Sequence, residues 1–232
     1  MLDSKLLLIE GPPGSGKSTT AELLAGEIAR AGQVCQCFQE WHPDNPIAIG
    51  SDLDLEKVVS TAIVREGEVL QQWQQFVSSK RASDSVTVME SRFWQTSVML
   101  MFAAGSPLEQ IIESNRRVVE AILPLKPALI YFAFDDLRGL TLQTIEIKEA
   151  EWQQAGFPGT WVGHIYEAMA NQAWFRQQSL SGLEAYLAFM EEWALISQQL
   201  YDRLPFPKLT IRNPNRDWPA TMQQMRQFLG LP

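Results

Sequence analysis

One stretch near the N-terminus restricts the fold of this chain more than any other. Residues 11–18 read G-P-P-G-S-G-K-S, which matches the pattern G-x-x-x-x-G-K-[ST] in every fixed position. An apolar run precedes this stretch and an Ala/Leu-rich helical pattern follows it, so we expect a strand, a tight turn and a helix in that order. The sequence therefore predicts a phosphate-binding loop (P-loop).

The residue types of this loop suit a nucleotide polyphosphate. The glycines allow successive backbone N–H groups to point inward, and the N-terminus of the next helix adds a positive dipole end. Lys17 would reach the β- and γ-phosphates, and the hydroxyl of Ser18 would ligate Mg²⁺, so ATP and Mg²⁺ are the expected ligands. Thr19 is expected to pack or to cap. The predicted nucleotide-binding residues are Gly11, Pro12, Pro13, Gly14, Ser15, Gly16, Lys17, Ser18 and Thr19.

Length and charge limit the classes of protein to consider. A chain of 232 residues suits a single α/β domain over 1–232. A net charge of -8 argues against a nucleic-acid partner, because phosphate backbones are bound by clustered Lys and Arg. No apolar run approaches the ~20 residues of a membrane span, and the first strand leaves no room for a signal peptide. We expect a cytoplasmic protein with a small-molecule acceptor, and a homodimer remains open.

Strand and helix patterns alternate along the chain, which is typical of a parallel sheet flanked by helices. Helices are expected over 17–31, from near Asp54 towards Val77, over 107–122 and after Asp217. The predicted fold is an α/β P-loop fold with a helical lid or insertion over 137–206, in which residues 156–163 form either a hinge or an ordered loop. The five strands are predicted over 5–10, 34–39, 85–90, 128–134 and 208–211.

Several helix starts carry capping patterns. Ser106, Pro107 and Glu109 suggest a capping box for the helix over 107–122. A second box over 181–184 would open a helix with one apolar face. Asp135 and Asp136 would be the N-cap and the first-turn acid of another helix, and Asp217 would cap the last one. The apolar face predicted for the helix after Ser181 comprises Leu183, Leu187, Met190, Ala194 and Leu204.

Residues that directly follow the strands are the candidate site residues, because ligands of open parallel sheets bind at the carboxyl ends of the strands. Glu90 ends the third strand and would either hold a Mg²⁺-bound water or act as a general base, unless it is a plain surface carboxylate. Trp41, His42 and Trp94 are equally suited to contacting a substrate and to packing.

The segment from Ile9 to Thr19 and the segment from Glu90 to Trp94 resemble the corresponding parts of thymidylate kinases and deoxynucleoside kinases. Both families carry an acid before the first loop glycine, as Glu10 is here. The resemblance implies that Arg92 holds the acceptor and that a neighbouring carboxylate lies near the reacting centre. It differs in that Ser91 separates the acid from the arginine and that the lid offers mainly Arg138 and Lys148.

The leading hypothesis is a P-loop kinase that moves the γ-phosphoryl group of MgATP to a small acceptor such as a nucleoside or a nucleotide. Lys17, Glu90 and Arg92 would be its catalytic residues, with Ser18 and Glu90 at the metal. The alternative is an ATP-dependent switch or hydrolase without a small-molecule acceptor, which the small number of arginines in the lid favours.

Overall fold

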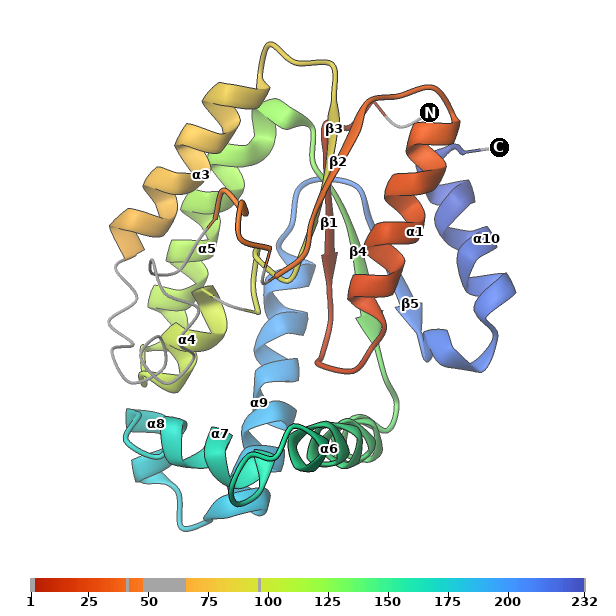
Figure 1. Cartoon of the computed structure of the whole chain (residues 1–232). Coiled ribbons are helices and arrows are strands. Elements are labelled where there is room, and N and C mark those ends of the chain that lie inside the picture. The colour runs from red at the N-terminus through yellow and green to blue at the C-terminus, as the bar shows by residue number, and fades with distance from the viewer. Residues whose placement is uncertain (1–2, 41, 48–65, 96, 232) are drawn as a thin grey trace.

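The computed structural model describes residues 3–40, 42–47, 66–95 and 97–231. Its centre is a five-stranded parallel sheet in the order β2-β3-β1-β4-β5 (Figure 1). The strands are β1 (Leu6–Glu10), β2 (Cys35–Phe38), β3 (Val86–Glu90), β4 (Ala128–Ala133) and β5 (Lys208–Arg212). The predicted sheet is confirmed, and each strand boundary lies within one residue of its expected position.

The strands are apolar on both faces because helices cover both faces. Leu6 and Leu8 of β1 join a core with α3 (Glu66–Lys80), α4 (Ser97–Ala103), α5 (Leu108–Ile122) and α9 (Gly182–Asp202). Leu7 and Ile9 point the other way, into a smaller core with α1 (Lys17–Arg30) and α10 (Trp218–Leu229). Alternate residues of one strand thus contact two helix layers. Figure 1 shows these layers on the two sides of the sheet.

A third group of helices lies beyond the carboxyl ends of the strands (Figure 1). These lid helices are α6 (Leu137–Gln154), α7 (Trp161–Met169) and α8 (Ala173–Gln177). The second half of α9 instead contributes to the main core through Trp193, Ile196 and Leu200. Two short 3-10 turns, η1 (Leu123–Leu125) and η2 (Pro214–Arg216), complete the chain. Among the described residues, no helix is both long and apolar enough to cross a membrane.

Two predicted capping boxes are wrong. Helix α5 begins at Leu108 with Pro107 in the N-cap position, and no side chain caps it. Ser181 is the N-cap of α9, but its hydroxyl accepts no hydrogen bond from the first turn. Both N-cap residues have an extended backbone and lie near glycines or prolines. The backbone conformation, and not a side-chain oxygen, therefore sets where each helix begins.

Other helix predictions fare better. Asp217 caps α10 as predicted, by accepting from the Ala220 N–H, whereas the N-cap of α6 is Asp136, one residue after the predicted Asp135, and it accepts from the Gly139 N–H. The predicted apolar face of α9 is only partly right, since Leu183 is exposed and Leu204 lies past the end of the helix. The start of the helix predicted from near Asp54 lies outside the described residues, and α4 is a helix that the sequence patterns did not indicate.

Candidate nucleotide-binding site

The P-loop joins the end of β1 to the start of α1, as predicted. Gly14 and Gly16 have φ values of 76° and 88°, a left-handed backbone that residues with a Cβ rarely adopt. A Cβ on Gly14 would stand 1.9 Å from the Thr144 hydroxyl of α6, so there is also no space for a side chain. Helix α6 therefore packs directly on the loop, and glycine is required at this point for two independent reasons.

Two polar side chains of the loop are buried in a way that fits an anionic ligand. The Lys17 ammonium is buried, donates to the Pro12 carbonyl at 2.9 Å and lies 3.9 Å from a carboxylate oxygen of Glu90. The hydroxyl of Ser15 is buried and has no hydrogen-bond partner among the residues that the structure describes. A buried hydroxyl without a partner is costly, and a phosphate oxygen is the kind of acceptor that would satisfy it.

Glu90 lies beside the P-loop because β3 pairs with β1, with Glu90 level with Ile9. One oxygen of the buried Glu90 carboxylate accepts from the Glu40 N–H at 3.0 Å, and the other accepts from the Ser91 hydroxyl. These contacts fix the carboxylate within reach of Lys17. The sequence correctly placed an acid next to the P-loop lysine.

Arg92 lies in a different position from Glu90, although only Ser91 separates them. Ser91 has φ 61°, a left-handed conformation that is uncommon for a residue with a side chain, and the chain turns sharply there. The Arg92 guanidinium is buried and donates to the Glu40 carbonyl, and its burial lowers its pKa. Arg92 does not belong to the lining of the main cavity, so its contact with an acceptor stays a prediction.

Glu10, the acid before the first loop glycine, holds the chain after β3. One of its carboxylate oxygens accepts from the Phe93 N–H at 2.9 Å and from the Trp94 N–H at 3.0 Å. Complete burial raises the pKa of Glu10 to about 8, against the lowering effects of the two N–H groups and of Lys17. Glu10 therefore links the end of β1 to the segment that follows β3, at the edge of the site.

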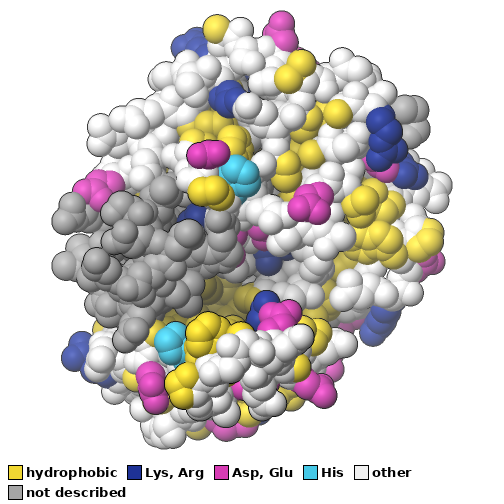
Figure 2. All heavy atoms as spheres, viewed as in Figure 1, with side chains coloured by type: hydrophobic (Ala, Val, Ile, Leu, Met, Phe, Trp, Pro, Cys, Tyr) yellow, Lys and Arg dark blue, Asp and Glu magenta, His cyan; other side chains and the backbone are white. Residues whose placement is uncertain are grey.

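A cavity of about 670 Å³ opens between the P-loop and the lid helices, within the range of about 300–1,000 Å³ that ligand pockets occupy. Figure 2 shows the surface hollowed at this place. One part of the lining comes from the P-loop and the segments that follow β2 and β3, and the rest comes mainly from helices. The polar part comprises Lys17, Ser18, Gln39, Glu40, Glu90 and Gln95.

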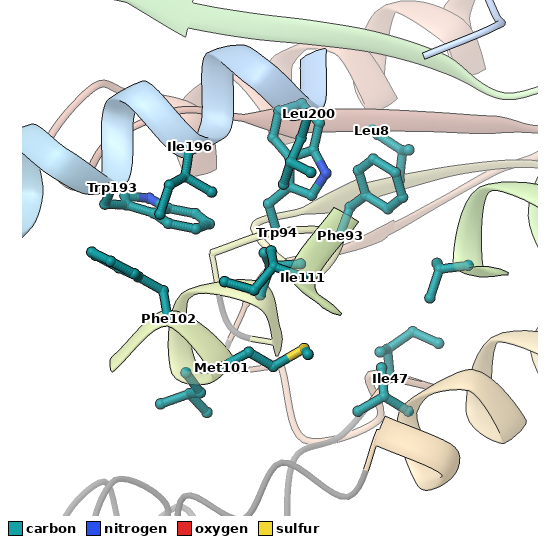
Figure 3. Packing of buried hydrophobic residues seen from close by; sticks show 14 of the residues in the cluster. Leu8, Ile47, Phe93, Trp94, Met101, Phe102, Ile111, Trp193, Ile196 and Leu200 are labelled. Carbon is teal, nitrogen blue, oxygen red and sulfur yellow. The ribbon is translucent and has the colours of Figure 1, made fainter. Parts of the chain in front are cut away.

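The remaining candidate residues fall into three groups. Trp41 lies outside the described residues, and His42 is exposed, with its ring edge-on to Phe38 at 5.7 Å. Trp94 is a core residue, 1% exposed (Figure 3), and its indole N–H donates to the Asn115 side chain at 2.8 Å. Of the two lid cations that the sequence analysis named, Lys148 lines the cavity, whereas Arg138 pairs with Glu184 and Glu191 on the surface.

Sequence reasoning missed most of the cavity wall. Gln95 and Asn215 line it from loops, and α6, α7 and α9 contribute apolar side chains. A signal existed, since the lining residues of each helix recur at helical spacing along one face. The spaced sets are Leu140, Thr144 and Ile147 on α6; Trp161, Ile165, Ala168 and Met169 on α7; and Tyr186, Phe189 and Met190 on α9.

The polar part of the cavity lining also fits the predicted Mg²⁺. Ser18 and Glu90 both line the cavity and offer a hydroxyl and a carboxylate, which are oxygen ligands of the kind that Mg²⁺ prefers. The described part of the chain holds no cluster of three His, Cys, Asp or Glu side chains suited to a metal. Magnesium bound with nucleotides commonly takes one or two protein ligands, with waters and phosphate oxygens supplying the others.

Comparisons with known proteins show the fold. No protein-family model matches the chain, and no curated protein sequence matches it. Solved structures do match, among them the structure of deoxyadenosine kinase from M. mycoides with bound dATP. That match has a TM-score of 0.50 and 14% sequence identity, and it covers 97% of this chain and 99% of the kinase. The chain therefore has the fold of a P-loop deoxynucleoside kinase.

Proposed function

We propose that this protein is a phosphotransferase that moves the γ-phosphoryl group of MgATP to the hydroxyl group of a small acceptor. One observation carries the proposal. The P-loop Lys17 and the buried carboxylate of Glu90 face a single cavity that extends beyond the P-loop to the lid helices. Such a cavity has space for a second molecule next to the phosphates, which a site for nucleotide alone would not need.

The donor side rests on the P-loop. The inward N–H groups of residues 11–18 and the start of α1 would bind the phosphates, with the Lys17 ammonium at the β- and γ-phosphate oxygens. Ser18 would ligate Mg²⁺ directly and Glu90 would hold it through a bound water, and the ion would neutralise part of the charge on those oxygens. The ammonium would exchange its bond with the Pro12 carbonyl for one with phosphate.

The acceptor side rests on Glu90. Transfer forms a bond between the acceptor oxygen and the γ-phosphorus and breaks the bond from that phosphorus to the bridging oxygen, which leaves with ADP. The acceptor proton must leave at the same time, and Glu90 would receive it as a general base. The neighbouring Lys17 would also favour the charge that develops on the transferred group.

The similarity to a deoxyadenosine kinase supports the same reaction class and puts nucleosides among the acceptors to test. The acceptor would enter between the ends of β2 and β3 and the lid helices. Arg92, behind Glu40, would act by holding the Glu40 backbone in place, since its guanidinium donates to that carbonyl.

The test combines turnover with nucleotide binding. With MgATP and a panel of nucleosides, nucleotides and small alcohols, ADP release should require one of the acceptors and should disappear in Lys17→Ala. ADP release at the same rate with and without every acceptor would instead indicate the ATP-dependent hydrolase or switch.

Glu90→Gln tests the proton step separately. Its amide oxygen can still accept from the Glu40 N–H, but it cannot take a proton, so kcat should fall by about 10²- to 10⁴-fold, while the Kd of ATP measured without Mg²⁺ changes little. Glu146→Gln, on the exposed side of α6, is the control and should match the wild type. An unchanged kcat in Glu90→Gln would exclude Glu90 as the base.

A further inference from the structure

Two parts of the cavity wall differ in chemistry. The polar part, at the P-loop and the ends of β2 and β3, holds the carboxylates of Glu40 and Glu90 as well as Lys17. The helix wall is formed by α4, α6, α7 and α9, and apart from Gln143, Thr144 and Lys148 of α6 it consists of aliphatic, aromatic and thioether side chains. Its larger side chains on α7 and α9 are Trp161, Ile165, Met169, Tyr186, Phe189 and Met190.

The side chains of the polar part hydrogen-bond to one another. The Gln95 amide donates to the Glu40 carboxylate at 3.2 Å, and its oxygen accepts from the Ser91 hydroxyl at 3.3 Å. Ser91 also donates to Glu90. A network of this kind can receive a hydroxyl group at its carboxylates, which act as hydrogen-bond acceptors.

The helix wall of the cavity has the properties of a binding site for an apolar group. Met99, Met169 and Met190 line it, and their flexible, polarisable side chains adapt to ligands of different shape. Ile147 of α6 also lines the cavity, yet 53% of it is exposed. An apolar ligand in the cavity would cover that side chain and remove apolar surface from water.

From this contrast we propose that the acceptor is an alcohol with an apolar body, in which the hydroxyl lies at Glu40 and Glu90 and the hydrocarbon lies among α4, α6, α7 and α9. The inference rests on the proposed phosphotransferase function and specifies its substrate class. Transfer would join the alcohol oxygen to the γ-phosphoryl group and release ADP, with the hydroxyl proton passing to Glu90.

The first test uses primary n-alkanols from butanol to octanol, beside deoxyadenosine and thymidine, with MgATP and detection of both ADP and the phosphorylated product. Each added methylene should raise kcat/KM roughly four-fold, the equivalent of about 0.8 kcal/mol, until the cavity is filled. Octanol should exceed both nucleosides by at least about ten-fold.

The outcomes separate the two proposals. Phosphorylation of the nucleosides with no gain from longer alkanols would overturn the apolar acceptor and leave the phosphotransferase intact. The absence of acceptor-dependent turnover with alkanols and nucleosides alike, in a protein that binds ATP, would overturn both.

A pair of variants on α6 tests the position of the hydrocarbon. Ile147→Gln should lower kcat/KM for octanol by roughly four- to sixteen-fold, as expected when one or two methylenes lose their apolar contact, and should change butanol less than two-fold. Leu142→Gln is the control, because Leu142 is 41% exposed on the same helix and does not line the cavity. Equal effects of the two variants would overturn the placement of the hydrocarbon beside α6.

Discussion

The pH dependence of stability should be governed in part by Glu10, and replacing it by glutamine isolates its contribution. Burial raises the pKa of Glu10 to about 8 in the folded chain, from an ordinary value of 4.5 that the unfolded chain would restore. Between these two values the folded state holds a proton that the unfolded state has lost. Stability should therefore fall as the pH rises from 4.5 towards 8 and level off above 8.

The magnitude follows from the separation of the two pKa values. At about 1.36 kcal/mol for each pH unit between them, the carboxylate would cost the folded state at most about 5 kcal/mol at pH 9. Glu10→Gln carries no titratable group, and its amide oxygen can accept from the Phe93 and Trp94 N–H groups as the carboxylate does. The variant should be near the wild type in stability at pH 5 and more stable by several kcal/mol at pH 9.

The assay is urea unfolding at pH 5, 7 and 9, followed by the fluorescence of the eight tryptophans. Comparing Glu10→Gln with the wild type at each pH cancels every other titrating group, and Glu146→Gln controls for the loss of one negative charge at an exposed site. A free-energy difference between Glu10→Gln and the wild type that does not change from pH 5 to pH 9 would refute the reasoning, because Glu10 would then be ionised throughout.

Two further variants test the loop and the core. Gly14→Ala should weaken ATP binding by at least about ten-fold in a calorimetric titration, because its Cβ meets Thr144. Gly156→Ala is the control, since Gly156 has the same φ of 76° but open space around it. A similar loss of ATP affinity in both variants would contradict the steric argument. Trp94→Phe should lower the unfolding free energy by about 1–3 kcal/mol, because it leaves the buried Asn115 oxygen without its donor. The Kd of ATP should stay unchanged, and a large change in that Kd would show that Trp94 contacts the ligand.

The parts of this structure that could be predicted from sequence are those set by local patterns. The P-loop combines fixed glycines with a strand before it and a helix after it, and the β-branched and aliphatic runs of the sheet are buried on both faces. The position of Glu90 could be predicted in the same way, because the end of a parallel strand that pairs with the first strand lies beside the loop.

The remaining parts depend on backbone conformation and on distant segments. The left-handed Ser91 turns Arg92 behind Glu40, and no pattern of residue types signals such a conformation at a serine. Trp94 lies in the core because Asn115, twenty-one residues away, provides its partner. The apolar wall of the cavity is assembled from single faces of separate helices, whose relative positions depend on tertiary packing.

The bonds from the Phe93 and Trp94 N–H groups to Glu10 join residues 83 and 84 positions apart in the chain. Closing so long a loop costs conformational entropy that the pairing of β1 with β3 must offset, and contacts of this range are among the slower to form during folding. The proposed nucleotide site would therefore form only after β1 and β3 have paired. ATP affinity, measured during refolding, would then report the pairing of these two strands and not the formation of the P-loop segment alone.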